Sequence, residues 1–129
     1  MLKNLPKAFT FDTGGTILDW HSGFRNGWEK KIREYNLDLD GAEIANLQRR
    51  KSLDMVTNQR QSNLINFDDA HKIAVEKICE EKKLDIKDSD KIFLHRTVPS
   101  KLTVWNDFID AFNLLKNQTL CVSFTLLSN

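Results

Sequence analysis

Two short segments rich in strand-forming residues lie near opposite ends of this chain, and the residues between them have helical patterns. Residues 8–12 read Ala-Phe-Thr-Phe-Asp, and residues 119–127 combine Leu, Val, Phe and Thr. A plain crossover between parallel strands needs only one helix. Several helices between two strands therefore predict an α/β sheet with a helical insertion.

The helices are predicted from apolar residues that recur every three or four positions and from residues that cap or end helices. Asp68 or Asp69 is expected to cap the third helix, and Val98-Pro99 to close the fourth. The expected helices cover residues 24–35, 41–58, 70–81, 88–96 and 104–115.

Composition excludes several classes of partner. The 129 residues fit one domain or a split one, and 19 basic against 18 acidic side chains give a net charge of +1. This balance does not favour nucleic acid as a partner. The start lacks the apolar core of a secretory signal, and no apolar run approaches the ~20 residues of a membrane span. We expect a cytoplasmic protein without a membrane partner.

The cysteines and histidines do not indicate a metal site or a disulfide. Cys79 and Cys121 lack Cys-x-x-Cys spacing, so free thiols are expected. His21, His71 and His95 lie far apart without a metal-binding motif. We expect no metal and no cofactor.

The first predicted strand ends in Asp12, which a glycine-rich turn follows. Ligands of open α/β sheets bind beyond the carboxyl ends of the strands. Asp12 can serve there as a nucleophile, with Thr16 as a hydrogen-bond donor, or it can simply begin a turn. The second strand ends in Ser128-Asn129, and if the strands are neighbours these residues meet Asp12.

Four sequence motifs resemble the haloacid dehalogenase superfamily. Residues 11–19, Phe-Asp-Thr-Gly-Gly-Thr-Ile-Leu-Asp, resemble its first signature, and residues 125–129, Thr-Leu-Leu-Ser-Asn, resemble its second. The final Ser-Asn pair is similar to the type II 2-haloacid dehalogenases. Residues 49–54 resemble the helical Arg-x-Lys-Gln-Leu-Glu element of that branch, and residues 105–107 resemble Trp-Pro-Asp at the start of a helix.

The resemblance implies a fold and its division. It implies a Rossmannoid three-layer α/β/α core of the haloacid dehalogenase type with an inserted helical cap. Residues 1–19 would hold the first strand and the nucleophile turn, residues 20–100 the cap, and residues 101–129 a helix and the second core strand. The core would be incomplete in this chain.

The resemblance also implies catalytic roles in a hydrolase that removes halide from a small 2-haloacid. Asp12 would attack the halogen-bearing carbon and form an ester that water hydrolyses. Thr16 would orient Asp12, and Arg49 would be the cation beside the halide. Ser128 and Asn129 would hold the nucleophile and the substrate carboxylate. An alternative for Arg49 is a solvated position in a basic run.

The substrate site would include Gly14, Gly15 and Trp20. Phosphatases of the superfamily carry a second Asp two positions after the nucleophile, and here that position is Gly14. Halide leaves without a proton, so Gly14 favours carbon–halogen chemistry over ester cleavage. A phosphatase, which would use Mg²⁺, is the alternative enzyme.

The family continues beyond its second signature with a lysine and an acidic loop. Those elements lie outside the 129 residues. We therefore expect a truncated, poorly active fragment of an enzyme. A non-catalytic helical interaction fragment is the alternative, and a homodimer is left open because an unpaired strand edge attracts partners.

Overall fold

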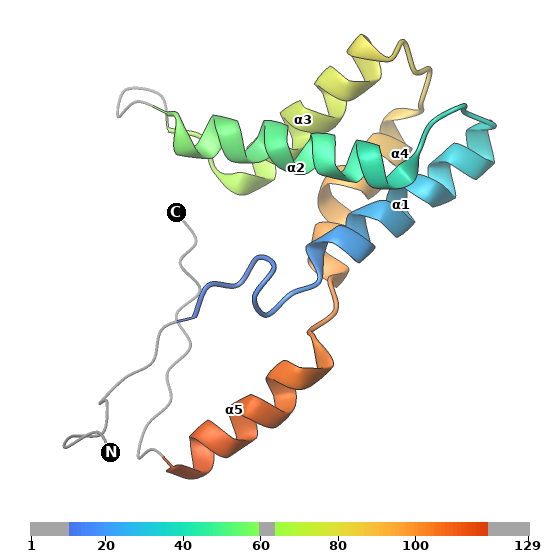
Figure 1. The fold of residues 1–129 in the computed structure, drawn as a ribbon. Helices are drawn as coiled ribbons and strands as arrows, with labels where there is room; N and C mark the ends of the chain where they lie inside the picture. The colour runs from blue at the N-terminus through green and yellow to red at the C-terminus, as the bar shows by residue number, and fades with distance from the viewer. Residues whose placement is uncertain (1–10, 60–63, 119–129) are drawn as a thin grey trace. The chain divides into compact units, whose positions relative to one another are not determined.

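Residues 11–59 and 64–118 are described by the computed structural model, and they fall into two compact units. The turn unit comprises residues 11–19 and 103–118, and the helical unit comprises residues 20–59 and 64–102. In chain order the helical elements are α1 (Trp20–Tyr35), α2 (Gly41–Thr57), α3 (Phe67–Glu81), α4 (Asp88–Ile92), a π-helical turn (Phe93–Thr97), a 3-10 turn (Pro99–Lys101) and α5 (Asn106–Gln118) (Figure 1).

The predicted helices are confirmed, with corrections at their ends. α1 begins four residues before the predicted start at residue 24, and α5 begins two residues after the predicted start at residue 104. The prediction that Asp68 or Asp69 caps α3 is wrong. Asn66 is the cap, because its side-chain oxygen accepts a hydrogen bond from the backbone N–H of Asp69 at 2.8 Å. The two aspartates lie in the first turn, where the positive end of the helix dipole stabilises their negative charge.

The α/β core is not confirmed. Of the predicted strand at residues 8–12, only Phe11 and Asp12 are described, and neither has regular secondary structure. The predicted strand at residues 119–127 lies outside the described residues. Within residues 11–59 and 64–118, strand-like pairing is limited to isolated bridges, from Leu18 to Gly14 and from Leu18 to Val104.

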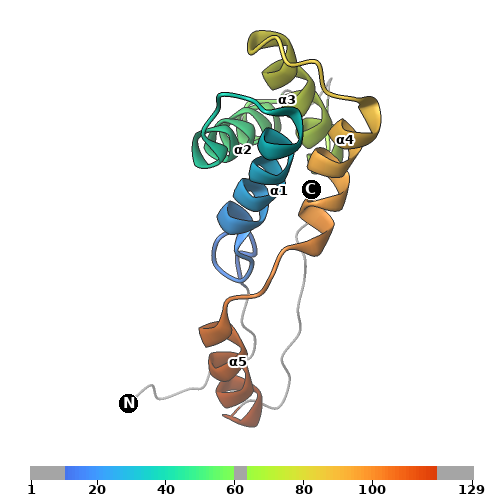
Figure 2. The same cartoon turned by 90° about the vertical axis from the view of Figure 1, so that its right-hand side faces the viewer.

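The core of the helical unit forms around Trp28. α2 packs against both α1 and α3 (Figure 2). The indole N–H of the fully buried Trp28 donates a 2.7 Å hydrogen bond to Oε1 of Gln48 on α2. The apolar side chains that fill this core are Ile44, Val75, Ile78, Cys79, Ile86 and Leu94.

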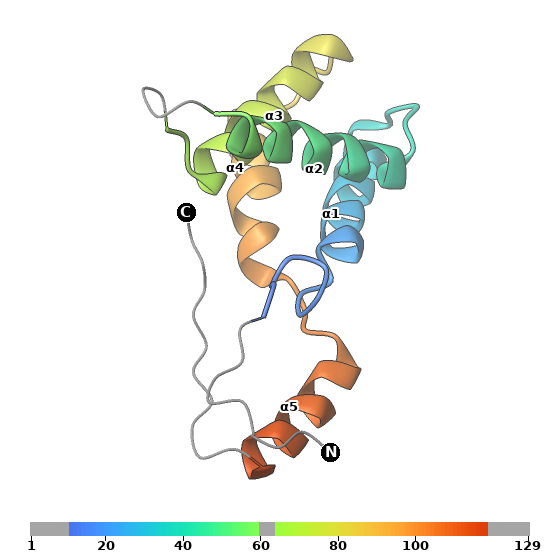
Figure 3. The same ribbon diagram turned by 60° about the vertical axis from the view of Figure 1, so that its left-hand side comes forward.

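The chain after α4 returns against the other helices of this unit. The π-helical turn contacts α1 and α3, and the 3-10 turn contacts α1 (Figure 3). Gly27 permits this approach, since a Cβ at that position would lie 2.6 Å from Cγ2 of Val98. Helical spacing alone does not reveal this requirement for glycine.

A buried lysine joins α1 to α4. Nζ of Lys31 lies 2.7 Å from Asp90 and 2.6 Å from Glu34, and the Tyr35 hydroxyl donates to Asp90 at 2.6 Å. Burial opposes the charge on Lys31, but the hydrogen bonds to Asp90 and Glu34 outweigh it, so the pKa of Lys31 is raised. The hydrogen bonds from Lys31 and Tyr35 lower the pKa of Asp90.

Removing the charge of Asp90 is expected to change the acid stability of the helical unit. A carboxyl whose pKa is lowered in the folded state stabilises that state above its unfolded pKa of about 3.9, and the contribution disappears as the pH falls through the folded pKa. Asp90→Asn should therefore unfold at lower urea concentration at pH 7 and show a weaker loss of stability below pH about 4.

Asp88→Asn is the matched control. Asp88 is exposed and makes a surface ion pair with Lys91 at 3.2 Å, which contributes little to stability. Urea unfolding followed by circular dichroism from pH 3 to 7 compares the two variants with the parent. Identical pH profiles for Asp90→Asn and Asp88→Asn would show that the Lys31 network does not stabilise the fold.

Candidate active site

A closed turn follows Asp12. The carbonyl of Thr13 accepts hydrogen bonds from the backbone N–H groups of Ile17 at 3.1 Å and Leu18 at 2.9 Å. The N–H of Gly15 donates to the carbonyl of Leu18 at 3.0 Å. Gly15 has a φ of 98°, a conformation that glycine adopts without strain. These bonds explain why the chain reverses directly after the carboxylate.

The turn brings Thr16 to the carboxylate of Asp12. The Thr16 hydroxyl donates a 3.0 Å hydrogen bond to Oδ2 of Asp12. Both side chains are exposed, so a small molecule can reach the carboxylate. Gly14 and Gly15, which the sequence analysis predicts to contact substrate, lie in the same turn.

Residues 103–105, which lie far from the turn in the sequence, make hydrogen bonds to it. The carbonyl of Thr103 accepts from the N–H of Asp19 at 2.9 Å, and the backbone N–H of Trp105 donates to the carbonyl of Ile17 at 2.9 Å. The Trp105 indole N–H also donates to the carbonyl of Gly15 at 3.1 Å. Sequence analysis missed this side-chain contact, because no spacing rule joins positions 15 and 105.

Arg49 on α2 lies against aromatic rings in the helical unit. Its guanidinium carbon lies 5.5 Å from the ring centre of Trp20 and 5.8 Å from that of Phe67. Both distances are within the cation–π range of about 6 Å. Arg49 is half-buried, whereas its neighbour Arg50 is exposed. The aromatic contacts limit the directions that the guanidinium can take.

A neutral histidine lies beside this aromatic group. The His71 ring packs edge-on against Phe24, with ring centres 5.2 Å apart, and also contacts Phe67. Among the described residues, its buried Nδ1 has no hydrogen-bond partner. Burial, followed by the positive charge of Arg49, lowers the pKa of His71 to about 4.

The stability of the chain is expected to fall on mild acidification because of His71. The unfolded imidazole binds a proton near pH 6.5, whereas the folded one stays neutral down to about pH 4, so stability is lost as the pH falls between these values. Burial and Arg49 act in this direction, as does His95, and Asp68 opposes them. The loss is at most about 3 kcal/mol.

His71→Gln tests this dependence, because glutamine stays neutral throughout. Chemical unfolding at pH 4.5 and 7 should show a smaller difference in the free energy of unfolding for His71→Gln than for the parent. His21→Gln serves as the control for replacing a histidine by glutamine elsewhere in the helical unit. An unchanged difference in His71→Gln would contradict the prediction.

Two predicted site residues, Ser128 and Asn129, lie outside the described residues, as does Cys121. Within residues 11–59 and 64–118, no group of three or more His, Cys, Asp or Glu side chains is arranged to hold a metal ion. No helix in that part of the chain is long and apolar enough to cross a membrane.

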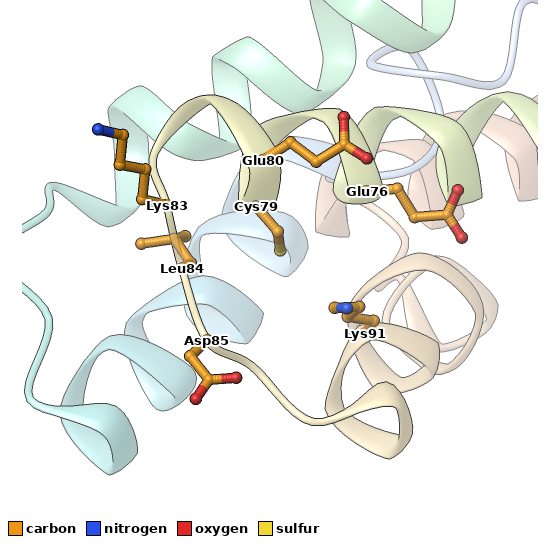
Figure 4. A pocket seen from close by; sticks show the side chains of 7 residues that line it. All are labelled: Glu76, Cys79, Glu80, Lys83, Leu84, Asp85 and Lys91. Carbon is orange, nitrogen blue, oxygen red and sulfur yellow. The ribbon is translucent and has the colours of Figure 1, made fainter.

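A cavity of about 470 Å³ lies elsewhere in the helical unit, and sequence analysis did not predict it (Figure 4). Its lining is highly charged, and it contains the free thiol of Cys79. Burial raises the pKa of this thiol, which keeps it protonated and weakly nucleophilic at neutral pH. The lining residues are Glu76, Cys79, Glu80, Lys83, Leu84, Asp85 and Lys91.

Solved structures identify the fold, although no family model and no curated protein matches the chain. The defluorinating L-2-haloacid dehalogenase Rha0230 aligns with a TM-score of 0.75 and 22% identity over 90% of this chain and 49% of its own. L-2-haloacid dehalogenase PA0810 aligns with a TM-score of 0.78 and 19% identity over 95% of this chain and 53% of its own. Over about half of their length, the chain shares the fold of these L-2-haloacid dehalogenases.

A third L-2-haloacid dehalogenase, from Xanthobacter autotrophicus, has chloropropionic acid covalently bound. It aligns with a TM-score of 0.69 and 20% identity over 93% of this chain and 46% of its own. The chain thus spans about half the length of these dehalogenases. The resemblance seen in the sequence motifs is confirmed at the level of the fold.

Proposed function

We propose that this chain is part of a hydrolase of the haloacid dehalogenase type, which removes halide from a small 2-haloacid. The observation that supports this proposal most directly is the hydrogen bond of 3.0 Å from Thr16 to the exposed carboxylate of Asp12, on a closed glycine turn. The likeness of the fold to L-2-haloacid dehalogenases favours dehalogenation among the reactions that such a carboxylate could carry out.

The proposed reaction has two steps. A carboxylate oxygen of Asp12 forms a bond to C2 of the haloacid while the carbon–halogen bond breaks and its electron pair leaves with the halide. Water then hydrolyses the resulting ester, releasing a 2-hydroxy acid and a proton and restoring the carboxylate. The chloropropionic acid bound covalently in the Xanthobacter autotrophicus dehalogenase supports a covalent step.

The remaining predicted residues have supporting roles in this proposal. Thr16 fixes one oxygen of Asp12 and thereby limits the rotation of the nucleophile. The Arg49 guanidinium, which is always charged, stabilises the negative charge that grows on the leaving halide. Ser128 and Asn129 are proposed to hold the nucleophile and the substrate carboxylate.

Gly14 and the helical unit complete the proposal. Gly14 has no side chain that could protonate a leaving alcohol, a loss of typically ~10²–10⁴-fold for ester cleavage that does not affect halide release. The helical unit is proposed to be the cap, with Trp20 forming part of the wall of the substrate site.

Asp12→Asn is expected to abolish dehalogenation, because the amide is a poor nucleophile. Protein expressed from the complete natural reading frame would be given L-2-chloropropionate, and chloride release would be measured. The variant should lose on the order of 10³-fold or more in kcat. Asp110→Asn is the matched control, since Asp110 is an exposed residue of α5, and it should keep the parent's rate.

The same assay separates the alternatives. Equal chloride release from the parent and Asp12→Asn would exclude Asp12 as the nucleophile. Mg²⁺-dependent hydrolysis of p-nitrophenyl phosphate without chloride release would indicate the phosphatase. Neither activity in a folded protein would indicate a non-catalytic fragment.

Arg49→Lys is expected to lower kcat/KM for L-2-chloropropionate by roughly 10- to 100-fold. Lysine keeps the positive charge but lacks the planar group that packs on Trp20 and Phe67, so the charge is less well oriented. Arg50→Lys, at the exposed neighbouring position, should behave like the parent. Equal kcat/KM values for the two variants would remove Arg49 from the proposed site.

A further inference from the structure

We propose that Trp105 is a positioning residue, whose indole N–H holds the Gly15 carbonyl and so keeps the Thr16 hydroxyl on Asp12. This inference rests on the proposed function for its catalytic consequence. Its structural basis is the 3.1 Å hydrogen bond from Nε1 of Trp105 to the carbonyl of Gly15.

Several backbone hydrogen bonds close the turn, but within residues 11–59 and 64–118 none of them involves the Gly15 carbonyl. The N–H groups of Ile17 and Leu18 both donate hydrogen bonds to the carbonyl of Thr13. The N–H of Gly15 donates to the carbonyl of Leu18. Gly15 has no side chain to limit its own backbone rotation. Among the described residues, the hydrogen bond to its carbonyl comes from Trp105, which lies 90 positions later in the chain.

The backbone that carries Trp105 is attached to the turn at two points. The N–H of Trp105 donates to the carbonyl of Ile17 at 2.9 Å, and the carbonyl of Thr103 accepts from the N–H of Asp19 at 2.9 Å. The carbonyl of Trp105 accepts a hydrogen bond from the N–H of Phe108, in the first turn of α5, at 3.2 Å. The start of α5 therefore fixes the place from which the indole reaches Gly15.

The exposure of Trp105 argues against a role limited to packing. The residue is 41% exposed, unlike Trp28, which is fully buried in the helical unit. A large aromatic residue left this exposed contributes less by burial than a core tryptophan does. Its indole N–H is nevertheless directed to one backbone carbonyl of the nucleophile turn.

The contact has a consequence for chemistry because Gly15 directly precedes Thr16. Rotation of the peptide between them moves the threonine hydroxyl, which lies 3.0 Å from Oδ2 of Asp12. Displacement of a reacting group by about 1 Å can cost about 10²-fold in rate. By holding the Gly15 carbonyl, Trp105 therefore keeps the Thr16 hydroxyl in the position from which it orients the Asp12 carboxylate.

The test removes the donor and keeps the ring. Trp105 is replaced by β-(3-benzothienyl)alanine, in which sulfur takes the place of the indole N–H, and in a second variant by Phe. In protein from the complete reading frame, kcat for L-2-chloropropionate should fall by about 10-fold in both, with KM within about two-fold of the parent. A benzothienyl variant with full kcat would overturn the proposal.

The same replacement at Trp28 is the matched control. Trp28 also donates its indole N–H, to Gln48 at 2.7 Å in the core of the helical unit. Its benzothienyl variant should melt at a lower temperature and keep the parent's kcat per folded molecule. A purely structural role for Trp105 predicts this same pattern for the Trp105 variant, and finding it would overturn the proposal.

Amide hydrogen exchange separates failure of this proposal from failure of the proposed function. In the 129-residue chain, the amides of Ile17 and Leu18 should exchange about 10-fold faster in the Trp105 variant and at the parent's rate in the Trp28 variant. Unchanged exchange in the Trp105 variant overturns the proposal, whatever the activity. Faster exchange in the Trp105 variant, together with no chloride release by the parent protein from the complete reading frame, would support the contact and reject the dehalogenase.

Discussion

Closure of the turn after Asp12 is the constraint on which the candidate site depends. One carbonyl, that of Thr13, accepts two backbone N–H groups, and this leaves the Thr16 hydroxyl 3.0 Å from the carboxylate of Asp12. The turn needs a glycine with positive φ at position 15. It also needs the distant segment at residues 103–105, so the local sequence alone does not fix the nucleophile in place.

The helical unit depends on polar groups that are buried and bonded. Gln48 accepts a hydrogen bond from the indole N–H of Trp28, and Lys31 donates hydrogen bonds to Asp90 and Glu34. Removing Gln48 would leave the indole N–H of Trp28 buried without this hydrogen bond, which costs more than the net gain from the pair itself. These bonds specify how α2 and α4 pack against α1, in addition to the apolar core.

Much of the helical architecture could be predicted from the sequence, because amphipathic spacing and capping residues are local signals. The N-cap of α3 was misplaced because Asn66, Asp68 and Asp69 are all good cap residues, and only backbone geometry selects between them. The burial of Gln48 could not be predicted from the sequence, since it depends on a hydrogen-bond donor 20 positions away.

The sequence by itself determined the order of the helices, the pairing of Thr16 with Asp12, and the resemblance to haloacid dehalogenases. Each of these depends on residues that lie close together in the sequence. Only the tertiary structure decided that Trp105 donates to Gly15 and that Arg49 packs against the rings of Trp20 and Phe67. Such contacts join residues far apart in the chain, and they require the tertiary fold to bring those groups within hydrogen-bond or cation–π distance.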